Sequence, residues 1–95
     1  MRWMEFIKVQ TTKANVKEIL LNFVTECKEC EGVVEARVFN HTTVNDCSLC
    51  LLWNTNRPKS QGSIVGLALS GALKKFGLVD HSVWVEEAEI EERKS

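Results

Sequence analysis

A chain of 95 residues has room for one domain with a core of its own, and at this size a partner subunit often covers part of the apolar surface. The formal net charge of -1, with acidic and basic residues mixed throughout, leaves no positive excess for binding phosphate backbones, so we expect no nucleic-acid partner. No stretch approaches the roughly 20 apolar residues of a membrane span, and the first nine residues carry three charges, unlike a secretory leader. We therefore expect a cytoplasmic protein with reduced thiols and no membrane partner.

The first predicted element is a strand over residues 3–11, in which apolar and polar side chains alternate between two faces. From about Ala14 the apolar residues recur at three- and four-residue spacing. This period predicts an amphipathic helix that ends at Gly32, because glycine takes the left-handed conformation of a helix C-terminus without penalty.

Alternation returns in residues 33–40, which predicts a second strand. The polar segment 41–46 is typical of a connection into a third strand over residues 47–54. That segment is apolar at successive positions, so both of its faces must be covered, and we expect it to lie in the centre of the sheet.

A loop with the only proline then leads into a second predicted helix, capped by Ser60 or Ser63 and closed by Gly77. Its expected buried stripe includes Val65, Leu69 and Ala72. Residues 80–87 alternate again and form the fourth predicted strand.

The order strand, helix, strand, strand, helix, strand is that of an α+β, ferredoxin-like βαββαβ fold, a four-stranded antiparallel sheet with both helices on one face. We expect residues 1–95 to form this single domain, with a charged tail, about 88–95, that extends the last strand briefly. The other face of the sheet would be open, and a functional site or a partner is expected there.

Four cysteines form two CxxC pairs separated by sixteen residues, close to the spacing of a four-thiolate zinc site. Cys27 and Cys30 fall at the end of the first helix, whereas Cys47 and Cys50 fall on the third strand, where residues three apart point to opposite faces. We therefore favour small core residues with a coincidental spacing. A zinc-binding domain that uses all four thiolates stays an alternative.

Two further sets of residues are candidates for chemistry. The segment Lys59–Ser63 combines a basic side chain, a glycine and two hydroxyl groups at a helix start, a composition that suits an anion, although an ordinary loop and cap also explain it. His81, at the start of the last strand, would reach a pocket on the open face as a proton shuttle, or would serve as a structural histidine.

Residues 31–39, Glu-Gly-Val-Val-Glu-Ala-Arg-Val-Phe, together with Leu51-Leu52-Trp53, resemble the antibiotic biosynthesis monooxygenase-like family. There a helix ends in glycine, runs into a strand, and the following strand finishes in an aromatic residue. The resemblance implies a homodimeric α+β barrel with a small-molecule pocket between sheet and helices. Some members of that family oxidise aromatic polyketides or quinols without a metal or flavin, so we expect no cofactor, and residues 54–80 lack the histidine that a haem-degrading member would use.

The favoured function is thus a homodimer that binds a small apolar or aromatic molecule, with monooxygenase-like chemistry on it. In such a pocket Trp53 would form a wall, Arg37 or Lys8 would bind an anion or phenolate, and His81 would be the catalytic proton shuttle. The alternative from another class is a non-enzymatic regulatory or interaction module of ferredoxin-like fold.

Overall fold

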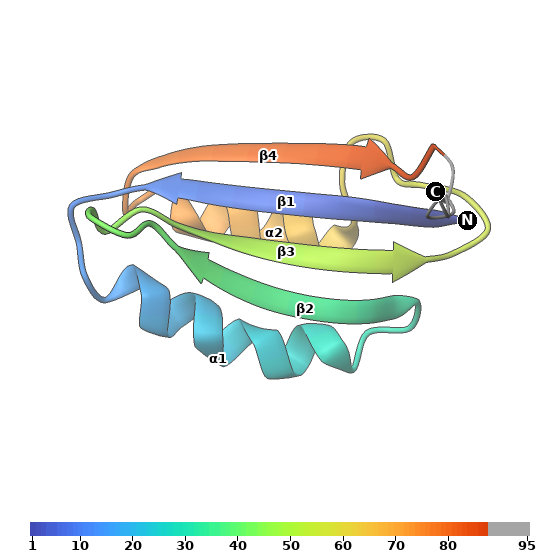
Figure 1. The fold of residues 1–95 in the computed structure, drawn as a ribbon, viewed down its shortest axis with the longest axis horizontal. Helices are drawn as coiled ribbons and strands as arrows, with labels where there is room; N and C mark the ends of the chain where they lie inside the picture. The colour runs from blue at the N-terminus through green and yellow to red at the C-terminus, as the bar shows by residue number, and fades with distance from the viewer. Residues whose placement is uncertain (88–95) are drawn as a thin grey trace, which may run out of the picture.

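The computed structural model describes residues 1–87, and it has the ferredoxin-like βαββαβ order (Figure 1). Its elements are β1 (Arg2–Gln10), α1 (Val16–Lys28), β2 (Val33–Asn40), β3 (Cys47–Asn54), α2 (Ile64–Leu73) and β4 (Leu78–Val85). The predicted extension of the last strand into the tail 88–95 lies outside the described residues. Within the described part, no helix is long and apolar enough to cross a membrane.

The four strands form one antiparallel sheet in the order β2-β3-β1-β4, so the segment predicted to be central, β3, is central together with β1. The register pairs Trp3 with Trp53 and Ile7 with Leu49 across β1 and β3. On the other side of β1, Ile7 pairs with His81. Because paired residues point to the same face of a sheet, these side chains all lie on one face.

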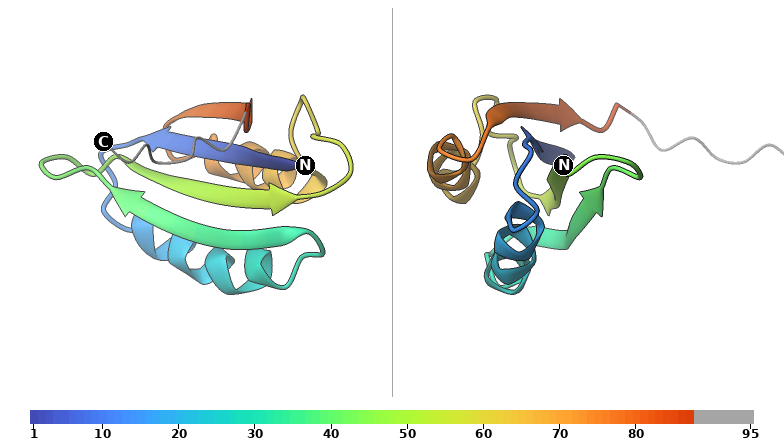
Figure 2. Two further views of the ribbon diagram at one scale, coloured as in Figure 1. Left: turned by 45° about the vertical axis from the view of Figure 1, so that its right-hand side comes forward. Right: turned by 90° about the vertical axis from the view of Figure 1, so that its left-hand side faces the viewer.

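Both helices cover this face, and they lie apart from each other. Helix α1 packs on β2 and β3, whereas α2 packs on β1 and β4 (Figure 2). The core lies between the sheet and the helices and contains thirteen buried apolar side chains. They are Trp3, Ile7, Val9, Val16, Leu20, Cys27, Ala36, Cys47, Leu49, Leu51, Trp53, Leu69 and Leu73. The opposite face of the sheet is open.

The bounds of β2 and β3 agree with the predicted ones, whereas the first helix is shorter than expected. It ends at Lys28, where the backbone N–H groups of Glu29 and Cys30 turn back to the carbonyls of Glu26 and Cys27. Gly32 does have a left-handed backbone, with φ of 93°. Gly32 forms the turn into β2 and does not end the helix. The prediction that the first helix ends at Gly32 is therefore wrong, although its left-handed backbone is as expected.

Helix α2 also differs from its prediction. Ser63, one of the two predicted caps, accepts a hydrogen bond from the Gly66 backbone N–H at 2.9 Å. The buried stripe holds Gly66 and Ser70 beside Leu69, while Ala72 is exposed. Helix α2 is therefore turned so that its smallest residues face the sheet, which lets it approach β1 closely.

The ends of the outer elements shift slightly as well. The second helix ends at Leu73, four residues before Gly77, and a side chain at Gly77 would overlap the Gln10 carbonyl. Gly77 thus permits a close backbone approach instead of closing the helix. The first strand runs over 2–10 rather than 3–11, and the last over 78–85 rather than 80–87.

Candidate functional site

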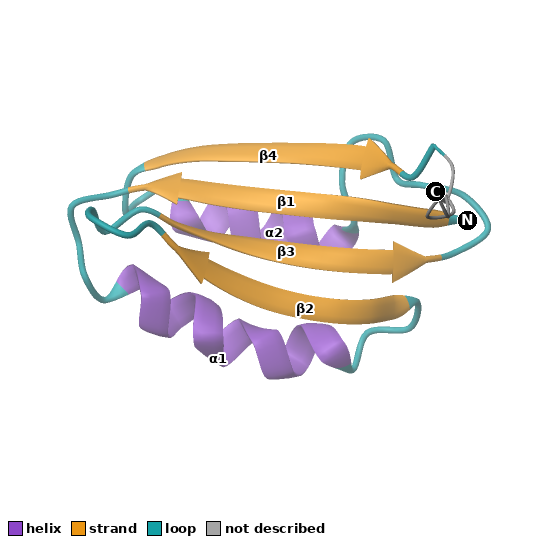
Figure 3. Cartoon of the chain, viewed as in Figure 1, coloured by secondary structure: helices purple, strands orange, loops and turns teal. Residues whose placement is uncertain are grey.

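An apolar hollow lies on the helix-covered face of the described residues, not on the open face where a site was expected. It has a volume of about 810 Å³ and lies between the end of α1, the start of α2 and the loop that joins β3 to α2. Figure 3 shows that these three segments lie at the same end of the sheet. Ile64, Val65 and Ala68 of α2 form one wall, and Cys30 and Glu31 lie opposite. This helix-side cleft is in the size range of small-molecule sites.

Two tryptophans form the floor of the cleft. Trp3 and Trp53 are paired residues of β1 and β3, and their rings stack with centroids 5.2 Å apart and planes 9° from parallel. The indole N–H of Trp3 donates to the Thr55 hydroxyl at 2.8 Å. Since that hydroxyl donates in turn to the Arg57 carbonyl at 2.7 Å, the loop above the cleft is tied to its floor.

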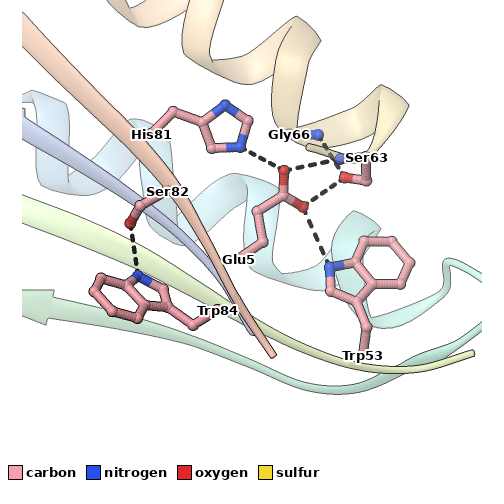
Figure 4. Close-up of polar contacts among 7 residues, drawn as sticks. All are labelled: Glu5, Trp53, Ser63, Gly66, His81, Ser82 and Trp84. Carbon is pink, nitrogen blue, oxygen red and sulfur yellow. Dashed lines mark hydrogen bonds and ion pairs between the residues drawn. The ribbon is translucent and has the colours of Figure 1, made fainter. Parts of the chain in front are cut away.

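Behind this floor lies a fully buried carboxylate, Glu5, whose side chain is 0% exposed. Oε1 accepts hydrogen bonds from the Trp53 indole N–H at 3.2 Å and from the Ser63 hydroxyl at 2.6 Å. Oε2 accepts from the Ser63 backbone N–H at 3.0 Å and lies 2.6 Å from His81 Nε2 (Figure 4). We call these four residues, Glu5, Trp53, Ser63 and His81, the Glu5 network.

The network explains the local sequence at the start of α2. A carboxylate is stabilised at a helix N-terminus by the free backbone N–H groups and by the helix dipole. A Cβ atom at Gly62 or Gly66 would overlap the side chains of the network, so both positions require glycine. The anion-binding composition recognised in Lys59–Ser63 is thus used internally, because Glu5 of the same chain supplies the anion.

The order of the groups limits their chemistry. Ser63 donates its hydroxyl proton to Glu5, and the carboxylate stands between that hydroxyl and His81. A nucleophilic serine needs the reverse order, with the histidine next to the hydroxyl to take its proton. The network can therefore hold a buried negative charge against an imidazole and fix the start of α2, but it does not activate Ser63.

His81 lies elsewhere than the sequence interpretation placed it. Its side chain is on the helix-covered face, 14% exposed and in contact with Glu5, so it does not reach the open face as expected. It is also not among the residues that line the cleft. As a proton shuttle it would have to act through Glu5 and Trp53, and its contacts are those of a structural partner for a buried charge.

The predicted ligand-binding residues divide between the two faces. Trp53 lies at the cleft, whereas Lys8 and Arg37 lie on the open face, Lys8 exposed and Arg37 bonded to Glu35 at 3.0 Å. Lys8 borders a shallow hollow of about 270 Å³, and Arg37 borders a separate one along β2. Neither cation can therefore share a pocket with Trp53, and the predicted grouping is wrong in this respect.

The cysteines do not converge on one point. Cys27 and Cys47 are buried in the core, as predicted, but Cys50 is half-buried on the open face beside Phe6. Among residues 1–87, no three His, Cys, Asp or Glu side chains gather as metal ligands. In this structure the four thiols therefore do not surround a common point, because Cys50 lies on the open face and Cys27 on the helix-covered face.

Burial also makes the thiols poor nucleophiles. It raises the pKa of Cys27 to about 11, with further contributions from the nearby Cys30, Glu26 and Glu5. Burial raises the pKa of Cys47 too, helped by Asp46. For Cys50, burial and Glu35 raise the pKa while Arg37 opposes them. Since the thiolate is the reactive form, these side chains act as packing residues at neutral pH.

The open face carries apolar side chains that no helix covers. Met4 and Phe6 are half-buried in its centre, while Phe39 is 49% and Trp84 61% exposed at its sides. Trp84 pairs with Met4 in the register, and its indole N–H donates to Ser82 on the same face (Figure 4). Charged residues, including Lys8, surround this apolar centre.

The alternation of residues 3–11 places Glu5 on the same face as the apolar side chains of that strand, but it indicates no role for Glu5. The available signal was a single acidic residue on a strand face that is otherwise apolar, formed by Trp3, Ile7 and Val9. Such a residue is either at an edge or paired in the interior, and its partners here are 48 to 76 positions away in sequence.

Comparisons with protein-family models, with curated proteins and with solved structures found no match to this chain. The similarity to the antibiotic biosynthesis monooxygenase-like family therefore stays a prediction that rests on the residues quoted above. What the chain does has to be argued from the cleft, the Glu5 network and the open face.

Proposed function

We propose that this protein binds a small, largely apolar or aromatic molecule in the helix-side cleft. The observation that carries the proposal is the apolar hollow of about 810 Å³ floored by two stacked indoles. Small-molecule sites are typically concave, lined by apolar and aromatic groups, and of this size. The position between sheet and helices is also the one that the family resemblance implies.

The Glu5 network supports binding by making the cleft rigid. Trp53 and Ser63 both line the cleft and both donate to the buried carboxylate. A ligand would therefore meet side chains whose rotamers are already fixed, which lowers the entropy lost on binding. This role needs no contact between the ligand and Glu5.

A neutral fluorescent probe, N-phenyl-1-naphthylamine, tests the proposal directly. We expect saturable fluorescence enhancement with the wild-type protein and at least tenfold weaker binding to Ala68→Trp, whose indole would fill the cleft. Ala72→Trp is the matched control, because Ala72 is exposed on the same helix but does not line the cleft. If the probe binds both variants as it binds the wild type, the cleft is not the binding site.

We also propose that the protein is a homodimer whose open faces pack together. Half-buried Met4 and Phe6 with exposed Phe39 and Trp84 form an apolar centre with charged surroundings, the usual anatomy of a subunit interface. Trp84→Glu would place a charge in that centre, and we expect a monomer by light scattering after size-exclusion chromatography. A dimer that persists in this variant would contradict the open-face arrangement.

Monooxygenase-like activity is the finer proposal, and it depends on cleft binding. Metal-free oxygenation needs an aromatic substrate that itself supplies electrons to oxygen, so the protein's task would be to hold that substrate and exclude water. Anthrone is a suitable probe, because O₂ converts its methylene to a carbonyl with release of one water. Oxygen uptake above the spontaneous rate, abolished in Ala68→Trp and kept in Ala72→Trp, would support catalysis. Uptake equal to the spontaneous rate would leave a binding protein.

A regulatory or interaction module is the second candidate, favoured by the outer surface of α2. The helix has no charged residue, and Ile64 is 89% and Leu67 50% exposed. Helices that are apolar on all sides are usually covered. Leu67→Glu would change the oligomeric state if this surface joins subunits, while an effect of Trp84→Glu alone would assign the contact to the open face.

A further inference from the structure

We propose that the ligand of the helix-side cleft is a largely apolar anion, with its apolar part against Ile64, Val65 and Ala68 of α2 and its acidic group at Arg57 and Lys59. This inference rests on the proposed binding function and adds the charge of the ligand. It follows from which polar groups of the cleft are already bonded and which are not.

The accessible apolar surface of the cleft comes mainly from α2. Ile64 and Ala68 are exposed there, whereas Trp3 and Trp53 at the base of the cleft are buried, 1% and 6% exposed. The indole N–H of Trp3 is bonded to Thr55, and that of Trp53 is bonded to Glu5, so neither is free to bind a ligand. Exposed apolar side chains of this kind favour the apolar part of a ligand, because contact with it removes apolar surface from water.

The start of α2 is already occupied in part by an anion of the chain itself. The backbone N–H of Ser63 donates to Glu5, and that of Gly66 donates to the Ser63 hydroxyl. The wall contributed by α2 carries no charged side chain. A full positive charge for an acidic ligand group must therefore come from another part of the cleft.

The loop between β3 and α2 supplies the available positive charges. Arg57 and Lys59 both line the cleft and both are exposed, and within residues 1–87 neither has an acidic partner at ion-pair distance. Glu31 is the only acidic residue among those that line the cleft in the described part, so the basic charges exceed it by one. The Trp3–Thr55–Arg57 hydrogen bonds hold this loop against the floor, so the charges stay close to the stacked rings.

Two probes that differ only in charge test the inference. 1-Anilinonaphthalene-8-sulfonate has the ring system of N-phenyl-1-naphthylamine with one added sulfonate. We expect the wild-type protein to bind the sulfonate probe about tenfold more tightly, the effect of one charge-assisted contact of roughly 1.4 kcal/mol. The preference should shrink as salt is added, because the loop is solvent-exposed.

Single substitutions show which basic side chains bind the sulfonate group. Arg57→Gln and Lys59→Gln should each weaken the sulfonate probe about threefold to tenfold and leave the neutral probe within twofold. Lys74→Gln is the matched control, since it removes one exposed positive charge outside the cleft and should change neither affinity. Circular dichroism of each variant verifies that the fold is kept.

The possible failures are distinct. If both probes bind equally and neither basic residue affects them, the anion inference is overturned while cleft binding stands. If the sulfonate probe binds Ala68→Trp as well as it binds the wild type, it binds outside the cleft, and the inference is also wrong. If neither probe binds the wild type, the proposed function itself fails.

Discussion

The charged side chains on the two faces of strand β1 have opposite environments. On the covered face, Glu5 is entirely removed from water and all of its acceptor capacity is used by three partners. On the open face, Lys8 keeps its charge in solvent next to Phe6, which is only half-buried. The polar groups of one face are therefore satisfied within a single chain, whereas the other face leaves apolar surface accessible to solvent.

This contrast teaches where each kind of function belongs. A buried charge with every partner in place fixes its neighbours, so the surface in front of it is suited to selecting a ligand by shape. An apolar face with charges at its edge is suited to association with a second protein surface. In the proposed arrangement, the cleft for the ligand and the interface for the second subunit therefore lie on opposite sides of the sheet.

The largest expected effect on stability comes from removing the carboxylate of the buried Glu5. Glu5→Gln replaces one carboxylate oxygen with a donor, which then faces the N–H or O–H groups of Ser63 or Trp53. We expect a loss of about 3–5 kcal/mol in the free energy of unfolding, because buried donors of Ser63 or Trp53 are left without an acceptor in the centre of the network. Urea denaturation followed by tryptophan fluorescence measures it.

Glu35→Gln is the matched control on the open face. Glu35 pairs with Arg37, and both side chains are about half exposed or more, at 48% and 64%. Such surface pairs contribute about 0–1 kcal/mol. Equal losses for the two glutamine variants would show that the Glu5 network is no more important to stability than a surface pair.

Two glycines of α2 test how closely this helix packs on Glu5, because only one of them faces the carboxylate. Gly66→Ala would push a methyl group into the Glu5 carboxylate, and we expect destabilisation of about 2–3 kcal/mol despite the better helix propensity of alanine. Gly71→Ala meets no atom within 4 Å and should stabilise the protein by up to about 1 kcal/mol. Thermal unfolding of both variants gives the comparison, and a stable Gly66→Ala protein would contradict the close packing of α2 on Glu5.

Alkaline pH tests the burial of a core thiol on the covered face. The folded chain raises the pKa of Cys27 from 9.0 to about 11, so the unfolded chain loses this proton first. Stability should therefore be intact below pH 9 and fall by about 2 kcal/mol by pH 11. Urea denaturation at each pH measures the free energy of unfolding. In Cys27→Ala, the part of its fall with pH that comes from Cys27 should disappear. An unchanged slope would show that Cys27 is not the source.

Periodicity was sufficient for the elements of this fold but not for the grouping of its site residues. The alternation in β2 and the continuous apolar run in β3 defined both strands to the residue, since each is bounded by clear turn residues. Whether Trp53 and Lys8 share a face depends on the register between β3 and β1, which no local pattern encodes. Lys8 pairs with Ser48 and shares its face, and Ser48 is five residues from Trp53 on β3. Lys8 and Trp53 therefore lie on opposite faces of the sheet.

The helix ends and the Glu5 network show the same limit. Gly32 and Gly77 were correctly recognised as special positions, but a glycine marks an unusual backbone or a close approach without saying which. The value of Glu5 lies in contacts with Ser63 and His81, which tertiary packing alone brings together. Distant pairings of this kind cannot be obtained from one sequence read by propensity.

The position of Glu5 near one end of the chain has a consequence for biosynthesis. A ribosome releases Glu5 early, but Trp53, Ser63 and His81 follow 48, 58 and 76 residues later. Until all three partners have emerged, β1 cannot be buried without leaving the Glu5 carboxyl group short of hydrogen-bond partners in the core. The nascent chain should therefore stay open to chaperones and proteases through most of its synthesis, and fold in one late step after β4 emerges.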